Sequence, residues 1–271
     1  MSYQTYSLNI QNHIADLRFN RPDKANSLNQ LAWDEMKRIF EELDVNDDVR
    51  VVVLSGEGKH FCAGIDLSLF ISVAQSDQGM DEGRRREKLR RHILHGLQAP
   101  INAIVDCRKP VLTAVDNGCI GAGIDIITAC DMNYCTEQAY FQVKEIDMGI
   151  VADLGTLQRL PAFVGEPMAR ELAFTGRKVS GPEAQKLGLV NRVFADRESM
   201  LQGVMALAET IAAKSPLAMR GTKEVMNYSR DRSISDGLNY VATWNAAMIL
   251  SDDVQQAFQA QLTKSKPSFQ N

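Results

Sequence analysis

Hydrophobic and polar residues alternate over the first twenty positions, and a period of two is typical of half-buried β-strands. The segment TYSLNIQNHIADLRF keeps this pattern on both sides of Gln11 and Asn12. We therefore predict two short strands joined as a hairpin at these residues. In the next segment apolar residues recur at helical spacing up to Leu43, which predicts an amphipathic helix capped by Asn26 or Ser27.

Two runs of β-branched and apolar residues predict strands that are buried on both faces. They are VRVVVL at 49–54 and PVLTAV at 110–115. The first leads into the loop segment SGEGKHFCAGID, and the second leads through DNGCIGAGID into a predicted helix. Because strands and helices continue to alternate along the chain, the pattern favours the α/β class.

The last quarter of the chain is almost wholly helical in pattern. It follows a helix that is predicted firmly by a capping box from Ser180 to Glu183 and a stop at Gly188. We therefore divide the chain into a core, residues 1–196, and a helical C-terminal region, residues 197–271. The most polar stretch, at 75–92, is expected to form a loop before a helix that stops at Pro110.

Composition narrows the classes of partner. The formal net charge of −4 and the pI near 5.7 give no overall basic field, so we expect no nucleic-acid partner. A hydrophobic fraction of 45% without a long apolar run predicts no membrane span. The five cysteines lie in apolar stretches without a Cys-x-x-Cys pair, which indicates reduced thiols. Neither end of the sequence resembles a targeting signal, and we expect a cytoplasmic protein.

Several common kinds of site are excluded by their motifs. The chain has no Gly-x-Ser-x-Gly segment and no Walker A segment, and GCIGAG at 118–123 does not have the dinucleotide-binding spacing. His92 and His95 lie three residues apart without a third ligand nearby, so no metal site is predicted.

The two loops after the buried strands offer a different chemistry. Small residues in FCAGID at 61–66 and GCIGAGID at 118–125 let a ligand approach the backbone, and a helix start directs free N–H groups outward. Two such loops could together hold one oxyanion. The alternative is that the glycines only form turns.

Four acids lie among apolar neighbours after these loops: Asp125, Glu145, Asp147 and Asp153. A carboxyl group that loses hydration has a raised pKa, so it can carry protons near neutral pH. The alternative is that Asp125 and Asp153 only cap helices.

Four motifs in this order resemble the crotonase (enoyl-CoA hydratase/isomerase) superfamily over nearly the whole chain. They are RPDKANSLN at 21–29, FCAGIDL at 61–67, KPVLTAVDNGCIGAGIDIITACD at 109–131 and FQVKEIDMGIVADLGTLQRLP at 141–161. The resemblance implies a crotonase-like spiral of repeated ββα units. It also implies a C-terminal helical region that assembles trimers, which commonly pair into hexamers.

The same resemblance implies an acyl-CoA thioester as substrate and no separate cofactor, because coenzyme A is part of the substrate. The thioester oxygen would lie between the backbone N–H groups of Ile65 and Ala122. Ala122 stands where glycine is usual, so its methyl group would slightly change the fit of the acyl chain. Residues expected to line the substrate are Ala63, Gly64, Ile65, Asp66, Leu67 and Ala122. Lys24 and Asn26 are placed along the coenzyme A path, with a plain turn and helix cap as the alternative.

The acids decide the reaction within this superfamily, whose hydratases carry two glutamates. This chain has Asp125 at the first position, Glu145 at the second and Asp153 eight residues further, which resembles the isomerases that convert 3,5-dienoyl-CoA to 2,4-dienoyl-CoA in fatty-acid β-oxidation. The resemblance implies that Glu145 removes a proton from C2, that Asp153 protonates C6 and that Asp125 tunes both. The alternatives are enoyl-CoA hydration, a 3-to-2 double-bond shift, and a non-catalytic protein that binds coenzyme A.

Overall fold

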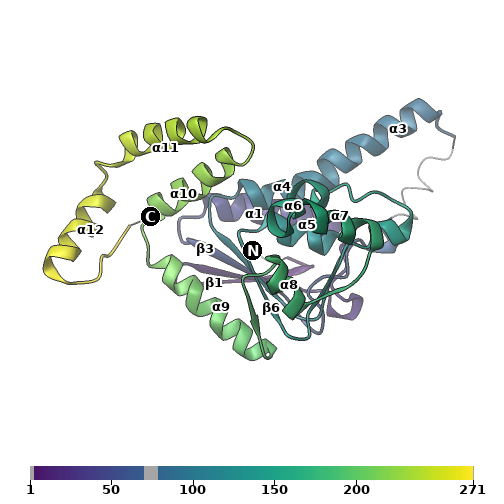
Figure 1. Cartoon of the computed structure of the whole chain (residues 1–271), viewed down its shortest axis with the longest axis horizontal. Helices are drawn as coiled ribbons and strands as arrows, with labels where there is room; N and C mark the ends of the chain where they lie inside the picture. The colour runs from purple at the N-terminus through teal and green to yellow at the C-terminus, as the bar shows by residue number, and fades with distance from the viewer. Residues whose placement is uncertain (1–2, 70–78, 271) are drawn as a thin grey trace.

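The fold is built around a six-stranded sheet with the strand order β1-β2-β3-β4-β6-β9 (Figure 1). The computed structural model describes residues 3–69 and 79–270. In this six-stranded sheet β1 and β2 are antiparallel, and the other neighbouring strands run parallel. The strands are β1 Tyr6–Gln11, β2 Ile14–Phe19, β3 Val51–Gly56, β4 Val111–Val115, β6 Met132–Thr136 and β9 Arg192–Phe194. A three-stranded sheet pairs β5 Gly118–Ile120, β7 Tyr140–Gln142 and β8 Val179–Ser180.

The predicted N-terminal hairpin is confirmed, and its turn lies one residue later than predicted. Gln11 pairs with Ile14, which leaves Asn12 and His13 as the two-residue turn, with φ of 52° and 66°. Positive φ at both central residues matches the right-handed twist of the strands, and asparagine tolerates it well.

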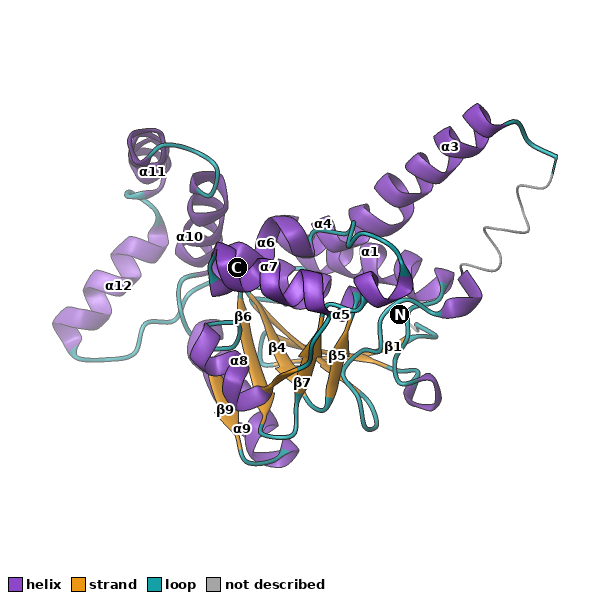
Figure 2. Ribbon diagram, turned by 45° about the vertical axis from the view of Figure 1, so that its right-hand side comes forward, coloured by secondary structure: helices purple, strands orange, loops and turns teal. Residues whose placement is uncertain are grey.

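Helices cover both faces of the large sheet (Figure 2). One face packs against α1 Gln30–Val45 and α4 Ala99–Asp106, and the main hydrophobic core there includes Trp33, Phe40 and Leu54. The other face packs against α9 Arg197–Ala212. Because both faces are covered, all six residues of β3 are buried, as its unbroken apolar run predicts.

The C-terminal helices divide into one that joins the core and three that extend beyond it. Met200 and Val204 of α9 pack with Val53 and Leu112 of the sheet. Helices α10 Pro216–Ser229, α11 Ile234–Met248 and α12 Asp252–Thr263 lie to one side of the body (Figure 1). The predicted boundary at residue 197 would separate α9 from the sheet that it covers. Both this boundary and the role of the C-terminal region in trimerisation stay predictions.

Lys223 ties α10 to the body. Its buried ammonium group donates to the carbonyl of Lys109 at 3.0 Å and to Asp131 Oδ2 at 2.8 Å. A buried charge is tolerated only with such partners, so this contact fixes where the C-terminal region leaves the core.

The predicted cap of the first helix is wrong. Asn29 caps α1, and its side chain accepts a hydrogen bond from the N–H of Ala32. The helix starts later than expected because residues 22–24 form a 3₁₀ turn, η1 Pro22–Lys24, and Leu28 then forms a β-bridge with Ile65.

The predicted polar loop at 75–92 is also wrong where the structure describes it. Residues 75–78 lie outside the described residues, and α3 Glu82–Arg91 is a helix that projects from the body (Figure 1). Asp81 caps α3, and Arg86 forms an ion pair with Glu82 one turn away. Arginine, lysine and glutamate are good helix formers, so a polar segment with these pairs needs no apolar face to be helical.

Six further helices of the described structure lie between α3 and β9 along the chain. They are η2 His92–Gln98, α5 Ala122–Ala129, η3 Glu145–Met148, α6 Thr156–Val164, α7 Glu166–Thr175 and α8 Gly181–Leu187. The predicted start and stop of α8 are confirmed: Ser180 accepts from the N–H of Glu183, and Gly188 ends the helix in the left-handed conformation.

The structure also bears on the cysteines, on membrane spans and on metal ligands. All five cysteines are buried and free. Within residues 3–69 and 79–270, no helix combines the length and the apolar character that crossing a bilayer requires. In the same part of the chain, no three His, Cys, Asp or Glu side chains cluster as metal ligands, and His92 and His95 lie in η2.

Candidate active site

The two glycine-containing loops lie against each other. The N–H of Cys62 donates to the carbonyl of Gly118 at 3.0 Å, and the N–H of Ile120 donates to the carbonyl of Cys62 at 3.0 Å. Gly64 has a φ of +90°, and a Cβ added there would lie 2.9 Å from the Ile120 carbonyl oxygen. Only glycine fits this contact, so the close approach of the loops depends on Gly64.

Two backbone N–H groups at this junction have no acceptor within the described structure. A parallel bridge to Leu28 uses the carbonyl of Gly64 and the N–H of Asp66, which turns the N–H of Ile65 away from Leu28. Ala122 is the first residue of α5, where a helix cannot satisfy its own N–H groups. Both donors are therefore available to an anionic oxygen, and the α5 dipole favours it.

Glu145 lies beside this junction. It begins η3, and a Cβ built on Gly121 would lie 3.2 Å from Glu145 Oε1 and 4.0 Å from the Cα of Gly64. Glu145 Oε2 is buried without a hydrogen-bond partner. Burial raises the pKa of Glu145, and the charge of Asp153 raises it further. The carboxyl group is thus a base placed next to both loops.

Asp125 is the most deeply buried of the three acids, with 1% of its surface exposed. Its Oδ1 accepts two hydrogen bonds of 2.7 Å, from the N–H and the hydroxyl of Thr156, whereas Oδ2 is buried without a partner. Burial raises the pKa of Asp125 to about 7, the hydrogen bond from Thr156 opposes this, and the charge of Glu145 adds to the rise. Asp125 can therefore exist as the neutral acid near neutral pH.

Asp153 is the outermost acid. Its side chain is exposed in the single chain, and its carbonyl oxygen accepts a hydrogen bond of 2.6 Å from Gln98 Nε2. Desolvation by the surrounding chain still raises the pKa of Asp153. Electrostatic coupling joins Asp125 to Glu145 and Glu145 to Asp153, so the structure brings these three acids together. Asp147 is instead exposed and paired with Lys144.

The loop residues expected to line the substrate divide into two groups. Ile65 and Ala122 provide the free N–H groups, and Leu67 is 60% exposed. Asp66 instead holds the loop, because its carboxylate accepts from Arg21 at 3.0 Å and from the Ser68 hydroxyl at 2.8 Å. These hydrogen bonds lower the pKa of Asp66 to about 2. Its side chain therefore supports the loop as a fixed anion.

Asn26 is a buried residue whose side chain stabilises the backbone of the first loop. It is 1% exposed, its amide N–H groups donate to the carbonyls of Glu57 and His60, and its oxygen accepts from the N–H of Arg21. No polar atom of this side chain is left for a coenzyme A path. Lys24 is exposed at the end of η1, where it can meet a ligand.

Two residues of the site were missed by the sequence analysis: Thr156 and Arg159. Thr156 holds Asp125, and the positive charge of Arg159 lowers the pKa of Asp125. Arg159 is fixed by hydrogen bonds to Asn102 Oδ1 at 2.8 Å and to the carbonyl of Leu154 at 3.3 Å. The sequence shows only polar residues near a helix start, and nothing in it pairs Thr156 with an acid 31 positions earlier.

Comparison with known proteins identifies the family. The family model described as enoyl-CoA hydratase/isomerase matches residues 9–271. The chain belongs to the enoyl-CoA hydratase/isomerase family. A solved enoyl-CoA hydratase from Bacillus anthracis superimposes with a TM-score of 0.88 at 29% identity, and covers 98% of this chain and 99% of that chain. The expected α/β spiral of this family is thereby confirmed.

Relatives within the family share more of the sequence. The peroxisomal Delta(3,5)-Delta(2,4)-dienoyl-CoA isomerase of Arabidopsis thaliana is 50% identical over 99% of this chain and 98% of its own length. The mitochondrial Delta(3,5)-Delta(2,4)-dienoyl-CoA isomerase of Homo sapiens is 46% identical over 96% of this chain and 79% of its own length.

These relatives contradict the cytoplasmic expectation. The plant enzyme is named peroxisomal and the human enzyme mitochondrial, so family membership does not support a cytoplasmic location. The physical reason is that targeting signals are short segments read by receptors, and neither the fold nor the active site depends on them. Composition therefore cannot decide the compartment.

Proposed function

We propose that this member of the enoyl-CoA hydratase/isomerase family is a dienoyl-CoA isomerase that converts 3,5-dienoyl-CoA to 2,4-dienoyl-CoA in fatty-acid β-oxidation. The observation that carries the proposal is the row of three coupled acids, Asp125, Glu145 and Asp153, beside two free backbone N–H groups. Relatives with this activity in their names match nearly the whole chain, which supports the same assignment.

The first step is removal of a proton from C2. Glu145 takes this proton, and the electron pair spreads from C2 into the thioester and along the conjugated carbons to C6. The N–H groups of Ile65 and Ala122 stabilise the negative thioester oxygen, and one such donor contributes about 3 kcal/mol to the transition state. A base with a raised pKa suits this step, because its proton affinity approaches what the reaction needs near neutral pH.

The second step is protonation at C6. Asp153 donates the proton there, so the double bonds move from C3 and C5 to C2 and C4, and one proton has left C2 while one has entered C6. Glu145 then holds a proton and Asp153 lacks one. The cycle closes when Glu145 releases its proton and Asp153 takes one up, which restores both groups.

The direct test is an assay of the purified protein with a 3,5-dienoyl-CoA. We expect formation of the conjugated 2,4-dienoyl product, followed by its ultraviolet absorbance. A panel with 2-enoyl-CoA and 3-enoyl-CoA distinguishes hydration and the 3-to-2 shift, and water addition is detected by mass. Turnover of a 2-enoyl-CoA to the hydroxyacyl product without dienoyl conversion would reject the isomerase assignment.

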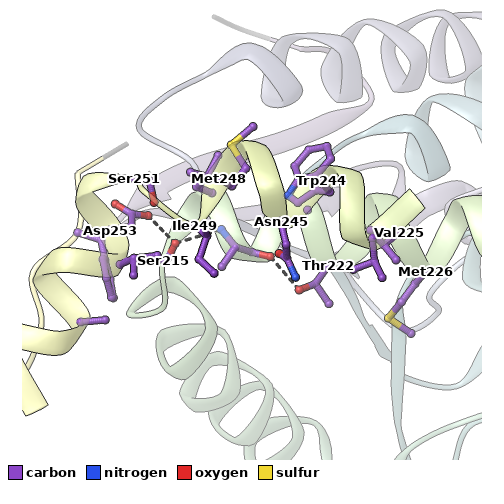
Figure 3. A pocket seen from close by; sticks show the side chains of 17 residues that line it. Ser215, Thr222, Val225, Met226, Trp244, Asn245, Met248, Ile249, Ser251 and Asp253 are labelled. Atoms are coloured by element: carbon purple, nitrogen blue, oxygen red, sulfur yellow. Dashed lines mark hydrogen bonds between the residues drawn. The ribbon is translucent and has the colours of Figure 1, made fainter. Parts of the chain in front are cut away.

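We also propose that the active protein is a homotrimer or a pair of trimers assembled through the C-terminal helices. Figure 3 shows the groove that supports this, with Trp244 of α11 and Met226 of α10 along its wall. The groove has a volume of about 500 Å³ and lies between α10, α11 and α12. Leu250 and Phe258 nearby are 85% and 69% exposed, which is unusual for side chains of this size unless a partner covers them.

Light scattering after size-exclusion chromatography measures this assembly. We expect a mass of three or six chains, and we expect Leu250→Asp with Phe258→Asp to shift it toward the monomer because two buried charges would oppose association. Helix content by circular dichroism serves as the folding control. A monomeric wild-type protein would contradict the trimer.

A further inference from the structure

Thr156 makes two short hydrogen bonds to one of the three acids, Asp125. It is wholly buried, and both of its donors, the N–H and the hydroxyl, point at one oxygen, Asp125 Oδ1, at 2.7 Å each. It is also the first residue of α6, so its N–H is one that the helix leaves unsatisfied. Two donors on one oxygen fix the carboxyl group in position and leave Oδ2 as the atom that gains or loses a proton.

Oδ2 of Asp125 is the second carboxyl oxygen, and Thr156 does not contact it. It is buried without a hydrogen-bond partner, as is Oε2 of Glu145, so the two carboxyl groups interact through space and not by a shared hydrogen bond. An unpartnered buried oxygen is costly when charged, and more so beside a second carboxylate. Burial raises the pKa of Asp125, and the hydrogen bonds from Thr156 to Oδ1 oppose this rise.

We infer that Thr156 is a positioning residue of the isomerase reaction, which holds the carboxyl group of Asp125 through two donors on Oδ1 and thereby sets the pH above which Asp125 ionises. The inference rests on the proposed function. When Asp125 is neutral, it adds no negative charge beside Glu145 and the oxyanion donors. When Asp125 is ionised, its added negative charge opposes the developing dienolate, so turnover falls.

The other ionisable groups that face Asp125 do not replace this control. Burial raises the pKa of Cys62 to about 12 and that of Cys119 well above its usual range, so both thiols stay neutral. Glu145 from η3 raises the pKa of Asp125, and Arg159 from α6 lowers it. The hydroxyl of Thr156 contacts Asp125 directly and can be removed by substitution without changing any of these charged groups.

The direction of the pH effect follows from these contacts. Asp125 has a pKa of about 7 against an ordinary value of 3.8, so it is neutral below that pH and ionises above it. Thr156 stabilises the ionised form, and loss of its hydroxyl raises the pKa of Asp125 further. The alkaline limb of the pH profile of kcat should therefore move to higher pH in Thr156→Val, by about 1 unit.

The test compares Thr156→Val, which removes the hydroxyl at nearly constant volume, with Thr156→Ser, which keeps it. Thr113→Val is the matched control, because Thr113 is also wholly buried and its hydroxyl donates to Asn133 at 2.8 Å in the central sheet. We expect the alkaline limb to shift in Thr156→Val alone. At the pH optimum kcat should fall about 10-fold with KM nearly unchanged, because one donor instead of two then holds the carboxyl group of Asp125 in position. If Thr156→Val does not fold, Thr156→Ala removes the same hydroxyl.

A second measurement does not depend on activity. Carbon-13 NMR of carboxyl-labelled aspartate follows the ionisation of Asp125, with Asp125→Asn to assign the signal. An upward shift in Thr156→Val and the wild-type value in Thr156→Ser are the expected results. Equal pKa values for Asp125 in both variants, or equal alkaline limbs, would overturn the role of Thr156. A wild-type protein without dienoyl-CoA turnover would reject the proposed function instead, and the NMR shift would still report on the contact.

Discussion

The Glu145→Gln variant should lose about 1000-fold in kcat with a 3,5-dienoyl-CoA, because an amide cannot accept the C2 proton. Glutamine has nearly the size of glutamate, so it fits beside Gly121, where Glu145 Oε1 lies 3.2 Å from a Cβ built on that glycine. We therefore expect the variant to fold and to bind acyl-CoA with nearly normal affinity. Initial rates from the ultraviolet assay and binding by calorimetry give the two quantities.

Asp147→Asn is the matched control for this substitution. Asp147 lies in the same short helix, η3, and its carboxylate is exposed and paired with Lys144 at 2.6 Å. Removing it changes the charge of the same segment by the same amount, and we expect kcat to stay within about 2-fold of the wild-type value because exposed pairs contribute little. A Glu145→Gln enzyme as active as this control would remove Glu145 from the mechanism.

The Asp153→Asn variant should lose at least about 100-fold in turnover, since a general acid typically contributes 10²–10⁴-fold. Its effect should differ in kind from that of Glu145→Gln. With Glu145 intact, the C2 proton can still be removed and returned, so the recovered substrate should gain deuterium at C2 in heavy water without isomerising. The Glu145→Gln variant should show neither exchange nor product.

Mass spectrometry and proton NMR of the recovered substrate separate these outcomes. Exchange at C2 with slow isomerisation in Asp153→Asn places Asp153 at the second step. Loss of exchange in this variant would assign Asp153 to the first step, and near-normal turnover would exclude it from proton transfer. Because Asp153 is exposed in the single chain and makes no hydrogen bond through its carboxylate that fixes the fold, its replacement should leave the unfolding temperature nearly unchanged.

The three acids differ in how far the folded chain shields them from water. Glu145 and Asp125 each have a buried, unpartnered oxygen, whereas Asp153 is exposed at the outer end of the row. The carboxyl group of Asp125 is therefore the most desolvated of the three, that of Glu145 is intermediate and that of Asp153 is the least desolvated. A proton acceptor that is shielded and a proton donor near the surface suit a reaction whose two proton transfers occur four carbons apart on one chain.

The sequence alone determined the elements whose signals are local. Alternation of hydrophobic and polar residues on both sides of Gln11 and Asn12 predicted the hairpin. The apolar run of β3 predicted a strand covered on both faces, and Ser180 with Gly188 predicted the ends of α8. The family motifs also pointed to the acids that we propose as the catalytic groups. These features depend on residues that are neighbours along the chain or that recur in a fixed motif order, so no tertiary contact is needed to recognise them.

The tertiary structure alone decided where long-range contacts compete with local preference. Asparagine is a common helix cap, yet Asn26 is buried and stabilises a loop. The bridge between Leu28 and Ile65 keeps the chain extended up to Asn29, so the helix starts there. The partnership of Thr156 with Asp125 exists only because α5 and α6 pack together. Burial and hydrogen bonding then set the charge of Asp125, and both are properties of the packed site that no segment of sequence carries by itself.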